Sequence, residues 1–106
     1  MIAENHTFMT VEELNFASSI LKAVSHPIRL QVVDLLDKHE YLSVNDICQR
    51  ISVEQSLTSH HLSKMRQHDI LGTRKEGQKV FYYLKLKSLT NILACMAHCL
   101  SAFRDQ

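Results

Sequence analysis

Residues 55–71 read QSLTSHHLSKMRQHDIL, and this stretch decides the fold. At about 100° per residue, a helix over these positions gathers its apolar side chains and one histidine on a single arc. The opposite arc holds hydroxyls, an imidazole, amides and an arginine, groups that can approach an anionic groove closely. An ordinary solvated polar helix is the alternative interpretation. The inner arc comprises Leu57, His61, Leu62 and Met65, and the outer arc comprises Ser56, Ser59, His60, Ser63, Arg66 and Gln67.

The length and composition narrow the class of protein. A chain of 106 residues fits one domain, which we place over residues 1–106. There is no apolar run of about 18 residues and no signal-peptide pattern, so we expect a soluble, cytoplasmic protein without a membrane partner. Three cysteines in no regular spacing argue against a secreted disulfide scaffold. Two glycines are too few for a glycine-rich phosphate loop.

The positive charge is concentrated in one part of the chain. Residues 1–49 hold three Lys or Arg and seven acidic residues, a net charge of −4. Residues 50–87, which include the polar helix, hold eight Lys or Arg and three acidic residues, a net charge of +5. This asymmetry is what a phosphate-facing surface requires.

A first helix is predicted over residues 11–24, after a loose arm at residues 1–9 that shows no periodicity. Thr10 and Glu13 fit a capping box at its start. Its apolar residues cover two sides of the helix. In so short a chain, we expect one of these sides to meet a second copy of the protein.

The next three elements lead into the polar helix. Pro27 suits the first turn of a second helix over residues 27–38, whose core stripe is predicted to be Ile28, Val32, Leu35 and Leu36. Residues 41–43 form a short extended link. Ser43 with Asp46 then caps a third helix over residues 44–51.

The connection between the third helix and the fourth, over residues 54–68, is only three or four residues long. Two short helices with this spacing predict a helix-turn-helix over residues 44–68. The hydrophobic period then changes to two over residues 72–84, which predicts a β-hairpin around Glu76-Gly77-Gln78. A final helix over residues 88–103 carries one strong apolar stripe.

These elements together predict a mostly α-helical fold with a small β-hairpin, namely a dimeric winged helix-turn-helix. The expected order is helix, helix, short strand, helix, helix, strand, strand, helix. The dimer contacts are predicted on the first and last helices, at Leu14, Leu21, Leu89, Ile92, Leu93, Met96 and Leu100.

A basic hairpin directly after a helix-turn-helix favours binding to double-stranded DNA. Gln55 can pair with an adenine edge in the major groove, and His60 can donate to a purine N7 or a phosphate. Ser56, Thr58 and Ser59 can donate hydrogen bonds or touch a thymine methyl. On the hairpin, the residues predicted to contact the phosphates or the minor groove are Arg74, Lys75, Gln78 and Lys79.

Three ordered motifs resemble the ArsR/SmtB family of bacterial repressors. They are LKAVSHPIRL at residues 21–30, QSLTSHHL at residues 55–62 and RKEGQKVFYYL at residues 74–84, and the resemblance covers residues 14–103. It implies a homodimeric winged-helix repressor that binds a palindromic operator and is released by an inducer. It also places Gln55, Ser56, Ser59 and His60 in the recognition helix of the family.

The metal-binding positions of that family are occupied by other residues here. The usual Cys-x-Cys positions read Ser43-Val44-Asn45, which cannot supply two thiolates. The positions of the other common site correspond to Leu86, Ser88, Cys99 and Ala102. We therefore predict no metal site and no cofactor, and the inducing molecule stays open.

The cysteines leave two interpretations. Cys48 lies in the third helix, where a small buried thiol is the ordinary explanation. Cys95 and Cys99 lie four residues apart on one face of the last helix, beside its apolar stripe. They either pack at the edge of a dimer interface or form a redox or soft-metal sensor.

These features are compatible with three functions. The first is a sequence-specific DNA-binding regulator, acting as a homodimeric repressor. The second is a thiol-, redox- or soft-metal-responsive regulator that uses Cys95 and Cys99. The third is a winged-helix protein-interaction module that does not bind DNA. An enzyme is not expected, because no carboxylate pair or nucleophile lies in an interpretable motif.

Overall fold

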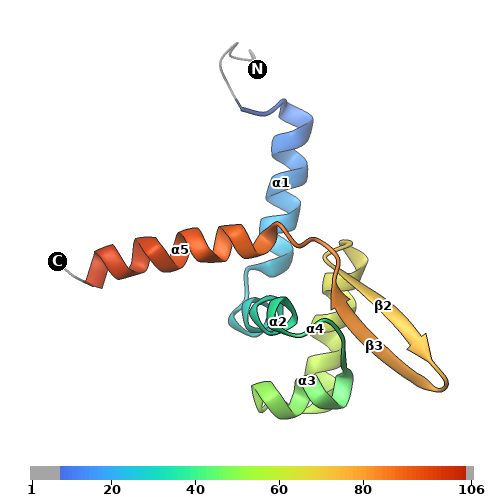
Figure 1. Cartoon of the computed structure of the whole chain (residues 1–106). Coiled ribbons are helices and arrows are strands. Elements are labelled where there is room, and N and C mark those ends of the chain that lie inside the picture. Colours follow the sequence, from blue (N-terminus) through green and yellow to red (C-terminus); the bar gives the residue numbers. More distant parts are fainter. Residues whose placement is uncertain (1–7, 105–106) are drawn as a thin grey trace.

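The computed structural model describes residues 8–104, and within them the elements follow the predicted order (Figure 1). Most of the arm predicted at residues 1–9 lies outside the described residues. The fourth helix is one residue shorter at each end than predicted, and the last helix begins and ends one residue later than predicted. The helices are α1 (Val11–Val24), α2 (Pro27–Lys38), α3 (Val44–Ile51), α4 (Gln55–Gln67) and α5 (Leu89–Arg104), and the strands are β1 (Leu42–Ser43), β2 (Leu71–Glu76) and β3 (Lys79–Leu84).

Both predicted capping boxes are confirmed. At the start of α1, the backbone N–H of Glu13 donates to Thr10 Oγ1 at 3.1 Å, and the backbone N–H of Thr10 donates to Glu13 Oε1 at 2.9 Å. Ser43 and Asp46 make the same exchange at the start of α3. These side chains satisfy backbone donors that the first turn of a helix leaves without a partner.

A different cap starts α2. Pro27 occupies its first turn, and His26 precedes it as the N-cap. The Nδ1 atom of His26 accepts a hydrogen bond from the backbone N–H of Ile28 at 3.1 Å. The sequence indicated a break at this point but gave no reason to expect an imidazole as the capping group.

The core lies where α2, α3 and α4 meet the base of the sheet. Within α2 the prediction needs one correction, because Val33 is 1% exposed while Ile28 and Leu35 are only half-buried. The helical period did not predict that Val33 is buried, because α2 packs against other elements on two sides. The buried apolar residues of the core are Ile20, Ala23, Val24, Val32, Val33, Leu36, Leu42, Ile47, Leu62, Met65, Ile70, Leu71, Leu84 and Leu89.

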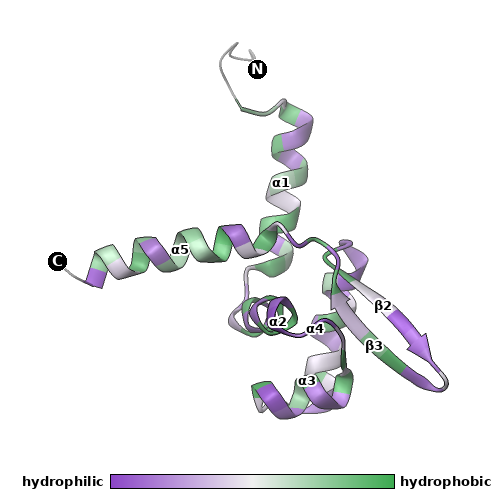
Figure 2. Cartoon of the chain, viewed as in Figure 1, coloured by the Kyte–Doolittle hydropathy of each residue, from purple (hydrophilic) through white to green (hydrophobic). Residues whose placement is uncertain are grey.

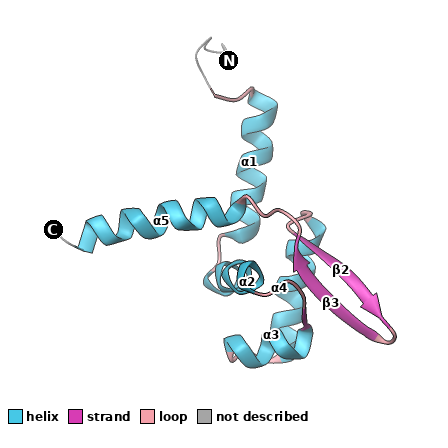
Figure 3. Cartoon of the chain, in the orientation of Figure 1, coloured by secondary structure: helices cyan, strands magenta, loops and turns pink. Residues whose placement is uncertain are grey.

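The β2–β3 hairpin, hereafter the wing, stands at one edge of the helical body (Figure 3). The sheet has the order β1-β3-β2 and is antiparallel, with Leu71 opposite Leu84 and Glu76 opposite Lys79. The turn between the two strands needs Gly77, whose φ of +63° lies in the left-handed region.

Two helices project from the body instead of packing fully against it. In Figure 1, α1 and α5 extend outward in different directions. The radius of gyration is 16.1 Å, whereas a compact chain of this length would have about 13 Å. Figure 2 shows apolar residues along both projecting helices. Within residues 8–104, both helices therefore keep large apolar side chains exposed, among them Phe16 and Leu21 on α1 and Met96 and Leu100 on α5.

None of the helices within residues 8–104 is long and apolar enough to cross a membrane.

Candidate nucleic-acid interface

The two helices of the helix-turn-helix are joined through a tight backbone turn. Ser52 ends α3 with φ 57° and ψ 46°, a left-handed conformation that redirects the chain within three residues. Glu54 then precedes α4 without making a side-chain cap. The N–H groups of the first turn of α4 are thus not capped by that side chain and lie at the positive end of the helix dipole. This end of α4 is suited to an anionic partner.

Four of the five residues predicted at this end of α4 lie at its surface. Gln55, Ser56 and His60 are exposed, and Ser59 is half-buried. The Ser56 hydroxyl donates to the Glu54 carboxylate at 3.1 Å, an exposed contact that a stronger partner could replace. These polar groups face the same side of the helix-turn-helix.

Thr58 is the exception, and the structure corrects its prediction as a DNA contact. Its side chain is fully buried, and its hydroxyl lies 3.4 Å from the backbone carbonyl oxygen of Val53, to which it donates. Leu57, expected on the inner arc, is instead 40% exposed. The buried arc at the start of α4 is therefore rotated by one residue, because Thr58 packs under the turn that precedes the helix.

The opposite side of α4 is fixed in the core, as predicted for His61. Leu62 and Met65 are fully buried, and His61 is 5% exposed. The Nδ1 atom of His61 accepts a hydrogen bond from Arg29 Nε at 2.9 Å. Burial, together with the charges of His26, Arg29 and His60, lowers the pKa of His61 from its ordinary value. This side of α4 thus holds a neutral imidazole.

The wing carries the other predicted contacts. Lys75, Gln78 and Lys79 are exposed near its tip. Arg74 is engaged within the protein: its guanidinium lies 5.2 Å from the centre of the Tyr41 ring and pairs with Glu76 at 3.2 Å. Hydrogen bonding to Tyr41 and the charge of Glu76 raise the pKa of Arg74. Arg74 therefore remains cationic beside Tyr41 and Glu76.

A groove joins the start of α4 to the wing. Its volume is about 390 Å³. Gln55 of α4 lies on one wall and Lys79 of β3 on another, so the structure brings together the two predicted contact regions. Its lining residues are Ser43, Val44, Asn45, Asp46, Gln55, Gln78, Lys79, Val80 and Phe81.

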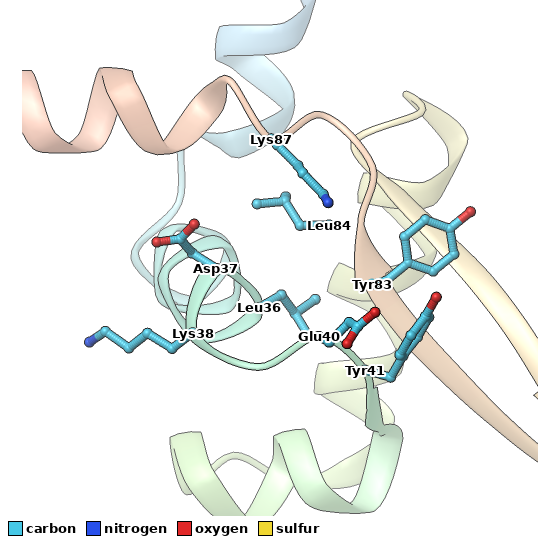
Figure 4. A pocket seen from close by; sticks show the side chains of 8 residues that line it. All are labelled: Leu36, Asp37, Lys38, Glu40, Tyr41, Tyr83, Leu84 and Lys87. Carbon is cyan, nitrogen blue, oxygen red and sulfur yellow. The ribbon is translucent and has the colours of Figure 1, made fainter.

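A second pocket, of about 470 Å³, lies on the other side of the wing, where β3 meets the end of α2 (Figure 4). Leu36 and Leu84 are buried beside it, while Asp37 and Glu40 add two carboxylates to its lining. Lys38 and Lys87 also line it, so its two acidic and two basic side chains balance in charge. Figure 4 also shows Lys87 pointing toward Leu84 and Lys38 pointing away from the pocket.

Aromatic packing supports the base of the wing. The rings of Tyr41 and Tyr83 meet edge to face, with centroids 5.6 Å apart. Tyr83 lies across Gly72 of β2, because a Cβ atom at Gly72 would come within 2.3 Å of the Tyr83 ring. Gly72 is thus required to let this ring lie over β2.

Most of the apolar residues that were predicted as dimer contacts on α1 and α5 lie at the surface of the structure. Leu14, Leu21, Ile92, Met96 and Leu100 are all at least 42% exposed, and Leu93 is half-buried. Leu89 is a correction: it is 4% exposed and belongs to the core of its own protomer, because it lies at the first turn of α5, against the body. Leu21, Ile92 and Met96 also line an apolar pocket of about 200 Å³ between α1 and α5.

The three cysteines are free thiols. Cys95 and Cys99 are exposed on α5, and Cys48 is half-buried, less enclosed than predicted. Within residues 8–104, no three His, Cys, Asp or Glu side chains are grouped in a way that could hold a metal ion.

Comparison with known proteins points to one class of protein. The sequence profile described as "Bacterial regulatory protein, arsR family" matches residues 26–71, which include α2, α3 and α4. The transcriptional repressor PagR of Bacillus anthracis is 33% identical over 86 residues, covering 81% of this chain and 83% of PagR. The transcriptional activator HlyU of Vibrio cholerae is 37% identical over 86 residues, covering 76% of this chain and 79% of HlyU.

Solved structures agree with the fold. The structure of HlyU from Vibrio cholerae superposes with a TM-score of 0.75 at 32% identity and covers 82% of this chain and 97% of that one. A homodimeric winged helix-turn-helix DNA-binding domain from Mycobacterium bovis superposes with a TM-score of 0.77 and covers 97% of this chain and 94% of that one. Its identity is 17%, so it supports the fold alone.

Proposed function

Because the chain belongs to the arsR family of bacterial regulatory proteins, and is thus a DNA-binding transcriptional regulator and not an enzyme, we propose that it acts as a homodimeric repressor. In this proposal, α4 enters the major groove of a palindromic operator, and the wing contacts the flanking backbone. The dimer represses by occupying the site, which requires no chemistry from the protein. The relatives include proteins that regulate transcription in either direction, since PagR is a repressor and HlyU is an activator.

The observation that carries the proposed contacts is the polarity across α4. Leu62 and Met65 anchor one side in the core, while Gln55 and His60 remain exposed on the other. A helix fixed in this way presents its hydrogen-bonding groups in a constant orientation, as base readout requires. Gln55 matches the edge of an adenine, and His60 matches a purine N7 or a phosphate. Ser56 and Ser59 complete the proposed contact set.

The wing supplies the sequence-independent part of the proposed interface. Lys75 and Lys79 neutralise phosphates, and Gln78 donates to the backbone or into the minor groove. Arg74 joins them by exchanging its exposed ion pair with Glu76 for a phosphate. An ion pair in which both side chains are more than half exposed costs little to break.

The proposed dimer uses the exposed apolar surface of α1 and α5, through Leu14, Leu21, Ile92, Leu93, Met96 and Leu100. A two-fold axis at this surface would relate two copies of α4 and place them on successive turns of the major groove, about 34 Å apart. The support is the projection of both helices beyond the body of a single protomer.

A selection from host genomic DNA tests this function. Sheared genomic DNA is incubated with the purified protein, and the affinity of an enriched fragment is compared with that of a scrambled fragment over a range of salt concentrations. We expect the enriched fragment to bind about a thousandfold more tightly, with log K falling linearly as log salt rises. A lack of enrichment together with salt-insensitive binding would contradict the proposal.

A thiol-responsive regulator remains the second candidate because Cys95 and Cys99 are both exposed and one helical turn apart. Titration of free thiols before and after peroxide treatment, with gel shifts of Cys95→Ser and Cys99→Ser, tests it. If oxidation leaves the operator affinity of the wild-type protein unchanged, these thiols do not regulate DNA binding. The third candidate, a module without DNA binding, does not agree with the family.

A further inference from the structure

One side chain outside the helix-turn-helix ties the recognition helix to the rest of the fold. Arg29, in the first turn of α2, is half-buried and uses its guanidinium twice. Its Nε donates to Nδ1 of His61 at 2.9 Å, and its Nη1 donates to the backbone carbonyl oxygen of Ala23 at 2.9 Å. Ala23 lies in the last turn of α1, where carbonyl groups lack helical partners. Arg29 thus joins α1, α2 and α4 at one point.

This connection adds a directional contact between α4 and another helix to the apolar packing that anchors α4. The other buried side chains of α4 that reach the core, such as Leu62 and Met65, make apolar contacts, which are non-directional. The Arg29–His61 bond is directional, because it needs the Nδ1 lone pair of His61 to point at the Arg29 Nε–H. His60 is the next residue toward the N-terminus, about 100° around the helix. Holding His61 in place therefore also sets the direction of His60 on the exposed side.

We propose that Arg29 is a positioning residue for operator recognition, acting through a neutral His61 whose protonation releases the recognition helix. The inference rests on the proposed DNA contacts of α4. It adds a residue that touches no DNA and a dependence on pH that those contacts do not by themselves contain.

The chemistry of the bond gives the sign of that dependence. In the structure Nδ1 of His61 is an acceptor, so its proton lies on Nε2. A second proton, on Nδ1, turns the acceptor into a donor and places a cation against the Arg29 guanidinium. The hydrogen bond is then lost and replaced by repulsion.

Among the described groups that act on His61, none is an acid that would stabilise the added charge. These groups are His26 before α2, Arg29 on α2 and His60 on α4. The ring centroid of His26 lies 4.4 Å from that of His61, and the ring centroid of His60 lies 5.7 Å from it. From α1, the carbonyl of Ala23 contacts only Arg29. Every one of these side chains is a cation when protonated, so all of them oppose a charged His61.

The pH window follows from the lowered pKa of His61. Above about pH 6.5 the imidazole is neutral in the folded and the unfolded chain, and the bond is intact. As the pH falls below that value, the unfolded chain and any conformation with a released α4 take up the proton first. The stabilisation that the Arg29–His61 bond gives to α4 is fully lost once the pH has passed below the lowered pKa of His61.

The test measures binding to the genomic fragment enriched by the wild-type protein, and to scrambled DNA, between about pH 8 and about pH 5 at constant ionic strength. For the wild-type protein we expect the specific affinity to fall about tenfold or more toward low pH. Binding to scrambled DNA should not fall in parallel.

The deciding variant is His61→Gln, whose amide oxygen can accept from Arg29 but does not titrate. Its affinity ratio between the two ends of the pH range should be close to one for the enriched fragment, whatever its absolute affinity. The matched control is His98→Gln on the side of α5 opposite the apolar stripe, which should retain the wild-type pH dependence. If His61→Gln keeps the acid loss of the wild-type protein, the proposal is overturned.

Two substitutions at Arg29 separate its geometry from its charge. Arg29→Met removes the donors, and Arg29→Lys keeps the charge but not the fork that reaches both partners. Both should lower specific affinity at about pH 8 by about tenfold, with little change on scrambled DNA. If circular dichroism shows that Arg29→Met does not fold, Arg29→Lys and His61→Gln still test the proposal. Wild-type affinity in Arg29→Lys would contradict the positioning role, whereas a wild-type protein without specific binding at any pH would contradict the proposed function instead.

Discussion

At the scale of the residue, two adjacent histidines do different work. His60 is exposed and His61 is buried against Arg29. The helical period alone predicted this division. It could not predict Thr58, because an apolar Leu57 is the natural choice for the inner arc when the preceding turn is not known. It also gave no sign of Arg29, since residues 32 positions apart in the chain are paired only by the fold.

Substitution on the exposed side of α4 should remove specificity without unfolding the protein. In His60→Ala and Ser59→Ala, we expect loss of preference for the enriched fragment, because each loses a group that reads a base edge, worth about 1–3 kcal/mol. Circular dichroism and light scattering should show a folded protein in its usual oligomeric state, and His98→Ala serves as the control. Normal specific binding by both variants would place the recognition surface elsewhere.

Thr58 gives a prediction of the opposite kind. Thr58→Val keeps the shape of the side chain but removes the donor to the Val53 carbonyl. We expect the free energy of unfolding to fall by about 1 kcal/mol, measured by urea denaturation, while the choice of DNA sequence is retained. A changed sequence preference with unchanged stability would show that Thr58 reaches the DNA after all.

Lys79 should act on every DNA sequence alike. In Lys79→Ala one phosphate contact is lost, so affinity falls for enriched and scrambled fragments together, and the slope of log K against log salt decreases by about one. Lys38→Ala, which removes a lysine paired with Asp34 on α2, is the matched control and should leave the slope unchanged. An unaltered slope in Lys79→Ala would place the wing off the DNA.

At the scale of the element, the sequence alone predicted the position of most helices and strands. The capping boxes at Thr10 and Ser43 located the starts of two helices, and the change of period from 3.6 to 2 located the wing. These signals are local, since each depends on residues a few positions apart. The packing of Tyr83 across Gly72 is not local in this sense, because it follows from the register of β2 and β3.

The wing should be sensitive at Gly72 for that reason. Gly72→Ala places a methyl group where the Tyr83 ring lies, so the ring must leave its contact with Tyr41. We expect a loss of stability of about 1–3 kcal/mol in thermal or urea unfolding. The double variant with Tyr83→Ala should recover part of the steric cost. Equal stability of Gly72→Ala and the wild-type protein would show that the ring is free to move.

At the scale of the whole molecule, the fold leaves large apolar side chains of α1 and α5 exposed within the described residues. The two apolar sides of α1 predict a dimer, and the exposed residues of α1 and α5 are its proposed interface. Leu89 shows the limit of that reasoning. An apolar stripe predicted along a helix does not show which of its turns packs against the core of the same chain and which is left for a partner.

A charge at the centre of the proposed interface should separate the protomers. Met96 is 52% exposed on α5, so Met96→Glu is compatible with a folded monomer but places a carboxylate between two apolar helices. Light scattering should report a monomer, and operator affinity should fall because one half-site is lost. Asn91→Glu, on the opposite side of α5, is the control and should remain dimeric. A dimeric Met96→Glu variant would move the interface away from α5.

The central claim is that the start of α4 lies in the major groove of DNA, in two copies related by a two-fold axis. Methylation interference on the enriched fragment measures this directly, because a methyl group on guanine N7 blocks the major groove at one position. We predict two symmetric clusters of interfering guanines about one helical turn, 10 to 10.5 base pairs, apart. Specific binding that tolerates N7 methylation throughout the fragment would contradict the account.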